Sequence, residues 1–145
     1  MDVATPAVQE FFDQYARSRS AMDIERIASQ YADSCMFAGP DGARVVEKQA
    51  VLAGFTQAME FLKTVGHTST QLASLNETSV DEHYAMVRAQ FVWRFEQAAA
   101  SPIDVAVDST FIPYIKDGVA KIVFQHEHED FWQALRTRGV LPSQG

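Results

Sequence analysis

The stretch that decides the fold is IDVAVDSTFIPYIKDGVAKIVFQHEHED, residues 103–130, which has the pattern of two long strands joined by a tight turn. Asp117-Gly118 is the strongest short-range hairpin signal in the chain, because a two-residue turn needs positive φ angles that such a pair adopts readily. A turn flanked by Lys116 and Val119 then predicts which residues face each other across the hairpin. The expected pairs on one face are Pro113 with Ile122, Phe111 with Phe124, Ser109 with His126 and Val107 with His128.

The two faces of this hairpin differ in character. The face with the four pairs is apolar near the turn and becomes polar at the far end, where it carries His126 and His128, as expected for a pocket wall. The alternation of the strands places Glu127 on the opposite face, away from both histidines. The full set expected on that opposite face is Tyr114, Lys121, Ile112, Val123, Thr110, Gln125, Asp108 and Glu127.

Length and composition limit the class of protein. The chain has 145 residues, of which 47% are hydrophobic, so we expect a single domain over residues 1–145. A formal net charge of -7 argues against a nucleic-acid partner, because a phosphate backbone is bound by clustered Lys and Arg. The start of the sequence has no apolar signal segment and no apolar run reaches the length of a membrane span, so we expect a soluble, cytoplasmic protein with no membrane partner.

Helices dominate the first half of the chain. Thr5 before Pro6 predicts a helix start, and Ser20 with Asp23 resembles a capping box that starts a second short helix. The longest helix is expected from Glu47 to Val65, because Val51, Leu52, Phe55, Met59 and Leu62 recur every three or four residues.

Strands dominate the second half. We expect a short strand ending at the turn of residues 39–42, a small edge strand over Arg44 to Val46, and a strand in the Thr- and Ser-rich segment after Gly66. The segment from Tyr84 to Glu96 alternates cleanly and predicts a half-buried antiparallel strand. Its expected inward face is Ala85, Val87, Ala89, Phe91, Trp93 and Phe95. A last helix is expected to start at Asp130 and end at Gly139, which makes the fold class α+β.

Two segments make the chain resemble a known superfamily. YADSCMFAGPDG, residues 31–42, follows an amphipathic helix pair, and KDGVAKIVFQHEHED, residues 116–130, lies near the end. With these segments the whole chain resembles the nuclear transport factor 2-like superfamily and its SnoaL-like branch. The resemblance implies a cone-shaped, cystatin-like fold, in which N-terminal helices pack over the concave face of a curved, mostly antiparallel sheet. It also implies a pocket between sheet and helices, and a homodimer.

The chain matches the ketosteroid isomerase branch without a gap from Phe12 to Pro40, but only some of the catalytic residues of that branch are present. Tyr15 falls where those isomerases keep the tyrosine that donates a hydrogen bond to the developing oxyanion. Gly39 falls at the position of the general-base aspartate and has no group that can take a proton. The second oxyanion donor would match Phe111 or, with the gap placed differently, Thr110. This comparison argues against steroid isomerisation.

Other branches offer different precedents. The strand that ends in His126 is similar to SnoaL-like proteins with a histidine at the inner end of the last strand. The same segment is similar in layout to the limonene epoxide hydrolase branch, in which Glu127 would match the catalytic aspartate. That branch also needs an arginine and aspartate pair on the neighbouring strand, and Arg88 and Phe91 do not reproduce it.

Each candidate residue also has a purely structural interpretation. Tyr15 lies on an apolar helical stripe, so it is either a core tyrosine or an oxyanion donor. His126 is either a core histidine satisfied by Ser109 or a proton shuttle, and His128 fits a partly solvated structural role. The two histidines lack an evident third ligand, so we predict no metal site and no cofactor. Cys35, the one cysteine, excludes an internal disulfide and is expected to be an inert buried thiol.

These residues lead to two alternative functions. The first is a binding protein that holds a small, largely apolar molecule, without catalysis or with an unidentified reaction. The second is an acid-base enzyme, namely an isomerase, lyase, dehydratase or cyclase, that uses Tyr15 and His126. The expected ligand-binding residues are Phe37, Phe55, Met59, Phe91, Trp93, Ser109, Phe111, Phe124 and His128. A homodimer is expected through the outer sheet face, at Tyr84, Met86, Val92, Ile112 and Val123.

Overall fold

The fold is a curved sheet with helices over one face, seen in a computed structural model that describes residues 4–98 and 100–142. In this part of the chain the sheet has the strand order β2-β1-β6-β5-β4-β3. Neighbouring strands are antiparallel except for β1 and β6, which are parallel. The helices and strands are α1 (Pro6–Ser20), α2 (Ile24–Ser29), β1 (Tyr31–Gly39), β2 (Gly42–Glu47), α3 (Lys48–Thr64), β3 (His67–Ser79), β4 (Ala85–Phe95), β5 (Ile103–Lys116), β6 (Val119–Glu127) and α4 (Phe131–Thr137).

Local sequence signals set the helix ends, mostly as predicted, but the predicted capping box at Ser20 is wrong because Ser20 ends α1 and its hydroxyl bonds to the backbone of Thr70. The side chain of Thr5 accepts a hydrogen bond from the backbone of Val8 at the start of α1, and Asp23 does the same for α2. Asp130 caps α4 by accepting from the backbone N–H of Gln133 at 2.8 Å. Gly66 follows α3 with a φ of 97°, and a side chain there would overlap the carbonyl oxygen of Glu96.

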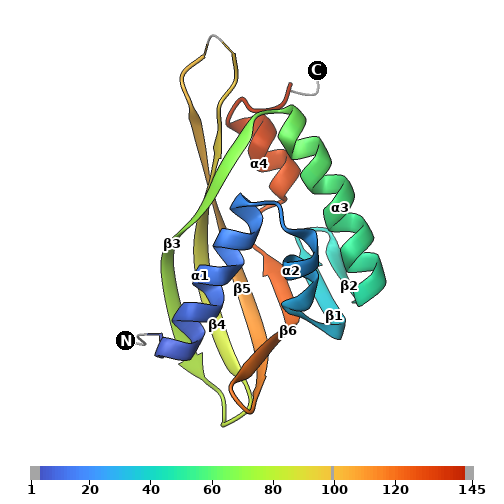
Figure 1. The fold of residues 1–145 in the computed structure, drawn as a ribbon, viewed down its shortest axis with the longest axis vertical. Helices are drawn as coiled ribbons and strands as arrows, with labels where there is room; N and C mark the ends of the chain where they lie inside the picture. The colour runs from blue at the N-terminus through green and yellow to red at the C-terminus, as the bar shows by residue number, and fades with distance from the viewer. Residues whose placement is uncertain (1–3, 99, 143–145) are drawn as a thin grey trace.

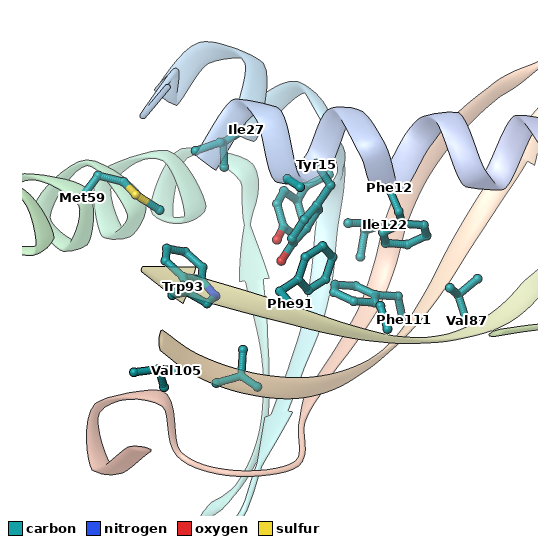
Figure 2. Packing of buried hydrophobic residues seen from close by; sticks show 14 of the residues in the cluster. Phe12, Tyr15, Ile27, Met59, Val87, Phe91, Trp93, Val105, Phe111 and Ile122 are labelled. Carbon is teal, nitrogen blue, oxygen red and sulfur yellow. The ribbon is translucent and has the colours of Figure 1, made fainter. Parts of the chain in front are cut away.

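The core lies between the sheet and the helices. Figure 1 shows α1 and α2 lying over one face of the sheet, with α3 beside them and α4 near one end of α3. Strand β4 buries every second residue towards these helices, so its predicted inward face is confirmed. In Figure 2, Phe12 and Tyr15 point from α1 towards Phe91 and Phe111 on the strands. Among the described residues, no helix combines the length and the apolar character needed to cross a bilayer.

The β5–β6 hairpin keeps its predicted turn but not its predicted register. Lys116 pairs with Val119 and Pro113 with Ile122, as expected from the Asp117-Gly118 turn. The ladder then skips Val123, which is an extra residue on β6, so the pairing beyond it shifts by one. The pairs that follow are Ile112 with Phe124, Phe111 with Gln125, Thr110 with His126 and Ser109 with Glu127.

This bulge makes the predicted faces wrong for the second half of β6. Phe124, His126 and His128 do not face the helices, whereas Gln125 and Glu127 do. The bulge lies next to Pro113 on β5. Proline has no N–H to donate to a regular ladder, so prolines within sheets occur at edges or bulges. The buried residues of β6 are accordingly Ile122 and Gln125, three positions apart rather than two.

Candidate active site

A cavity of about 370 Å³ lies between the concave face of the sheet and helices α1, α3 and α4. Its walls are mostly aromatic or apolar side chains from both layers, and Figure 2 shows Tyr15, Met59, Phe91 and Trp93 converging there. Pro40, Arg44 and Asp130 also line it and are exposed, so its mouth lies beside these residues. The apolar wall residues are Phe37, Ala38, Phe55, Ala58, Met59, Leu62, Phe91, Trp93, Val107, Phe131 and Trp132.

A second and larger hollow, of about 670 Å³, lies elsewhere on the molecule. It runs between α1, α2 and the tip of the β5–β6 hairpin, and most of the residues that line it are exposed. Its charged side chains, such as Glu10, Asp23 and Glu25, are solvated rather than buried. Polar groups held in fixed positions inside an apolar wall are the mark of a small-molecule site, so the smaller cavity is the candidate.

Glu127 places a carboxylate at the inner end of this cavity. Its Oε2 accepts a 2.7 Å hydrogen bond from Ser109 Oγ, and its Oε1 accepts one of 2.6 Å from Gln125 Nε2. Ser109 and Gln125 are themselves buried, so the carboxylate is held from two sides. Glu127 is half-buried and lines the cavity, which leaves it able to meet a ligand. A carboxylate in this setting can accept a hydrogen bond or a proton.

Tyr15 lines the same end of the cavity. Its ring stacks on Phe91 with 4.8 Å between the centroids, and burial raises the pKa of the Tyr15 phenol. The positive charge of Arg19 acts to lower this pKa, while the negative charge of Glu127 adds to the rise. The phenol is therefore a neutral hydrogen-bond donor near neutral pH, as the oxyanion role requires.

A chain of buried hydrogen bonds links Glu127 to Arg19. The Arg19 guanidinium donates to the Tyr31 hydroxyl at 3.0 Å, and this hydroxyl donates to Gln125 Oε1 at 2.6 Å. Gln125 in turn donates to Glu127. Burial holds the pKa of Tyr31 well above its ordinary value, so its proton stays in place in the chain.

The sequence interpretation missed Glu127, Arg19 and Gln125 as pocket residues, although two signals were present. Arg19 lies four residues after Tyr15, which places it on the same buried stripe of α1. Pro113 marks the bulge that turns Gln125 and Glu127 towards the helices.

The cavity brings together most of the predicted site residues. Tyr15, Phe37, Phe55, Met59, Phe91, Trp93 and Ser109 all line it. Phe111 faces inward as predicted but lies within the core, where its ring packs against Phe12 at 4.9 Å and Tyr15 at 5.2 Å. Gly39 lines the cavity near the mouth and brings no side chain that could act as a base.

Besides Phe111, three further predicted site residues do not line the cavity. Phe124 pairs with Ile112 and His126 with Thr110 on the outer face of the sheet. The ring of His128 lies 4.7 Å from that of His126, and its Nε2 forms a 2.7 Å hydrogen bond with Thr110 Oγ1. The predictions that His126 hydrogen-bonds to Ser109 and shares a cavity with Tyr15 are therefore wrong. No cluster of three His, Cys, Asp or Glu side chains suited to a metal occurs within residues 4–98 and 100–142.

Solved structures share this fold at low sequence identity. Aln2 from a Streptomyces species is 14% identical with a TM-score of 0.73, and the alignment covers 94% of this chain and 100% of Aln2. An NTF2-like protein with a cystatin-like fold from Novosphingobium aromaticivorans is 13% identical with a TM-score of 0.71, over 94% of this chain and 88% of the other. A putative scytalone dehydratase from the same organism is 13% identical with a TM-score of 0.67, over 83% and 80% of the two chains.

Family membership follows from the sequence rather than from these structures. No curated protein matches the chain in sequence. The model of the family described as NTF2-like protein (DUF6841) matches residues 5–130, which run from the cap of α1 to the cap of α4. This match includes the strands that carry Ser109 and Glu127 and all the residues that line the cavity except Phe131 and Trp132. The superfamily expected from the sequence is confirmed, and the chain belongs to the NTF2-like family DUF6841.

Proposed function

We propose that this chain binds a small, largely apolar molecule in the cavity, with Glu127 as its polar anchor. The observation that carries the proposal is a carboxylate, held by two hydrogen bonds, in a cavity whose walls are mostly aromatic and apolar. A volume of about 370 Å³ lies within the range of roughly 300–1,000 Å³ that small-molecule sites occupy. Such a pocket is also what the resemblance to the SnoaL-like branch leads us to expect.

Binding can be tested by filling the cavity. Ala58 lines it from α3, so an Ala58→Phe variant would place a ring where the ligand lies. The matched control is Ala53→Phe, which adds the same ring to an exposed position on the same helix. Uncharged aromatic alcohols and ketones, titrated by calorimetry, should bind the parent and Ala53→Phe but not Ala58→Phe. Equal binding by both variants would contradict the proposal.

Acid-base catalysis is a second candidate, favoured because Glu127 and Tyr15 line the same cavity. Both residues line the cavity, and the pKa of Tyr15 is raised mainly by burial, with the negative charge of Glu127 adding to the rise. Glu127 would take a proton from the ligand, and Tyr15 would donate a hydrogen bond to the oxygen on which charge develops. Among the structural neighbours, one is named as a putative dehydratase. This proposal moves the proton-transfer role from His126 to Glu127.

The catalytic candidate requires its own test. Uncharged hydroxylated and carbonyl compounds that bind to the parent protein would be screened for conversion by mass spectrometry. If one is converted, Glu127→Gln should lower kcat by about 10²-fold or more, because a positioned general base contributes typically 10²–10⁴-fold. A Glu127→Gln variant with unchanged kcat would rule out Glu127 as the base.

A further inference from the structure

Arg19 carries a buried positive charge beside the cavity. Its side chain is 0% exposed, yet all four groups that accept its hydrogen bonds are uncharged. They are the backbone oxygen of Tyr15 at 3.2 Å, Ser18 Oγ at 3.3 Å, Gln30 Oε1 at 2.8 Å and the Tyr31 hydroxyl at 3.0 Å. No carboxylate of the described residues forms a direct ion pair with this guanidinium. Its charge therefore has to be balanced at longer range.

The hydrogen-bond network of Arg19 leads to the carboxylate of Glu127. Along the path from Arg19 through Tyr31 and Gln125, every N–H or O–H donates towards the carboxylate. Both charges also act on the Tyr15 hydroxyl, with opposite sign. Of the other charged residues that line the cavity, Arg44 and Asp130 are exposed at the mouth, where water screens them. The inner end of the cavity thus holds one positive and one negative charge.

We propose that Arg19 and Glu127 form a charge-balanced pair, bridged by Tyr31 and Gln125, which makes the cavity select an uncharged ligand that carries a hydrogen-bond donor. This inference rests on the proposed function. A cationic or anionic ligand would leave a net charge in a low-dielectric site, which is costly. An ionised carboxylate only accepts hydrogen bonds, so the ligand group that meets Glu127 is a hydroxyl or an N–H.

Arg19 is a positioning residue in this scheme. Its guanidinium carbon lies 3.2 Å from the centroid of the Tyr15 ring, so the guanidinium packs directly on the face of Tyr15. Through Tyr31 it also holds the amide of Gln125 in the orientation that donates to Glu127. Arg19 lines the cavity but is 0% exposed, and its guanidinium is occupied by protein acceptors, so its effect on a ligand is mainly electrostatic.

Three naphthalene probes of similar shape separate charge from size. They are 2-naphthol, which is neutral at about pH 7, 2-naphthoate, which is an anion, and 2-naphthylmethylammonium, which is a cation. Calorimetric titration of the parent protein should give 2-naphthol an affinity about tenfold or more above either ion, since a nearby charge typically shifts an ionisation equilibrium by about one to three pKa units. Similar affinities for all three probes would overturn this inference and leave the proposed function standing. Binding of none of them would overturn both.

Charge-removing variants should then reverse the preference. Glu127→Gln leaves Arg19 unbalanced and should favour 2-naphthoate, whereas Arg19→Gln leaves Glu127 unbalanced and should favour 2-naphthylmethylammonium. The double variant restores balance and should favour 2-naphthol again. The matched control is Arg17→Gln, which removes an exposed charge from the same helix outside the cavity and should keep the order of the parent.

A purely structural role for Arg19 would produce a different pattern. In that case Arg19→Gln would lower the affinity for all three probes alike, the order of the three affinities would not change, and the proposal would be wrong. Should Arg19→Gln fail to show a cooperative thermal transition, the nearly isosteric Glu127→Gln variant decides the question alone. An unchanged probe order in Glu127→Gln would overturn the proposal.

Discussion

Ser109 Oγ donates a 2.7 Å hydrogen bond to Glu127 Oε2, across a hairpin whose turn alone would have placed Ser109 opposite His126. The extra residue Val123 makes the difference, because it shifts the pairing of β6 by one position. A shift of one exchanges the two faces of a strand. The bulge therefore decides that the cavity contains a carboxylate rather than an imidazole.

The first prediction compares Glu127 with its neighbour His126. Glu127→Gln should weaken the binding of 2-naphthol about tenfold or more, because hydrogen bonds to a charged group contribute about 1.5–3 kcal/mol. His126→Gln is the matched control on the outer face and should bind like the parent. Calorimetry on both variants provides the comparison. If His126→Gln weakened the binding of 2-naphthol and Glu127→Gln did not, His126 would be the site residue, as predicted from the sequence.

Much of the fold could be predicted because its signals are local. The caps at Thr5 and Asp130 and the turn at Asp117-Gly118 depend on neighbouring residues alone. The inward face of β4 was also predictable, since eleven residues alternate without interruption. These elements were sufficient to place Tyr15, Phe91 and Trp93 in one cavity.

The polar end of the cavity was harder to predict because it depends on contacts between distant segments. Tyr31 and Gln125 are 94 positions apart in the chain and meet only when β1 pairs with β6. Arg19 looks like an ordinary charged residue near a helix end until Gln30 and Tyr31 enclose it. The alternation of β6 gave a wrong answer because a single bulge interrupts it, and Pro113 was its only visible sign.

The second prediction concerns the dependence of stability on pH. Burial is the main cause that lowers the pKa of His67, whose Nε2 hydrogen-bonds to Thr70 Oγ1 at 2.9 Å beside the ring of Trp93. A folded-state pKa below the unfolded value means that the unfolded chain binds more protons. The stabilising contribution is therefore complete above about pH 6.5 and is lost as the pH falls through the folded-state pKa.

Urea unfolding at a series of pH values tests this sign. His67→Gln should show a shallower loss of unfolding free energy between about pH 7 and 5 than the parent. His128, whose pKa is also lowered mainly by burial, should supply part of the slope that remains. A His67→Gln variant with an unchanged slope would contradict the assignment.

The third prediction is that Cys35 is unreactive in the folded protein. Its side chain is buried in the core, and burial raises the pKa of the thiol to about 12. At about pH 8 only on the order of one thiol in 10,000 is then a thiolate, which is the reactive form. Iodoacetamide should label Cys35 slowly in buffer and completely in guanidinium chloride. Rapid labelling in buffer, monitored by mass spectrometry, would show that the thiol is accessible.

The fourth prediction is a homodimer through the outer face of the sheet. Tyr84 and Met86 are exposed there, and Val92, Ile112 and Val123 are half-buried in the single chain. Light scattering at micromolar concentration should give twice the mass of one chain. Met86→Glu should shift the mass towards the monomer because it places charge in the contact, and Ala53→Glu on α3 should not. A monomeric parent protein would contradict the prediction.

The last prediction tests the bulge itself by deleting Val123. If Val123 is an extra residue, its removal leaves Ile112 opposite Phe124 and Ser109 opposite Glu127 in a regular ladder, so the carboxylate stays in the cavity. The deletion should cost less than about 3 kcal/mol of unfolding free energy, and the variant should still bind 2-naphthol. Deleting Val92 is the matched control, because this half-buried valine lies in the uninterrupted β4–β5 pairing. Its loss would exchange the faces of half of β4 and should abolish cooperative unfolding. If the Val123 deletion were as damaging as the Val92 deletion, Val123 would be a regular member of the ladder and the position of Glu127 would need another explanation.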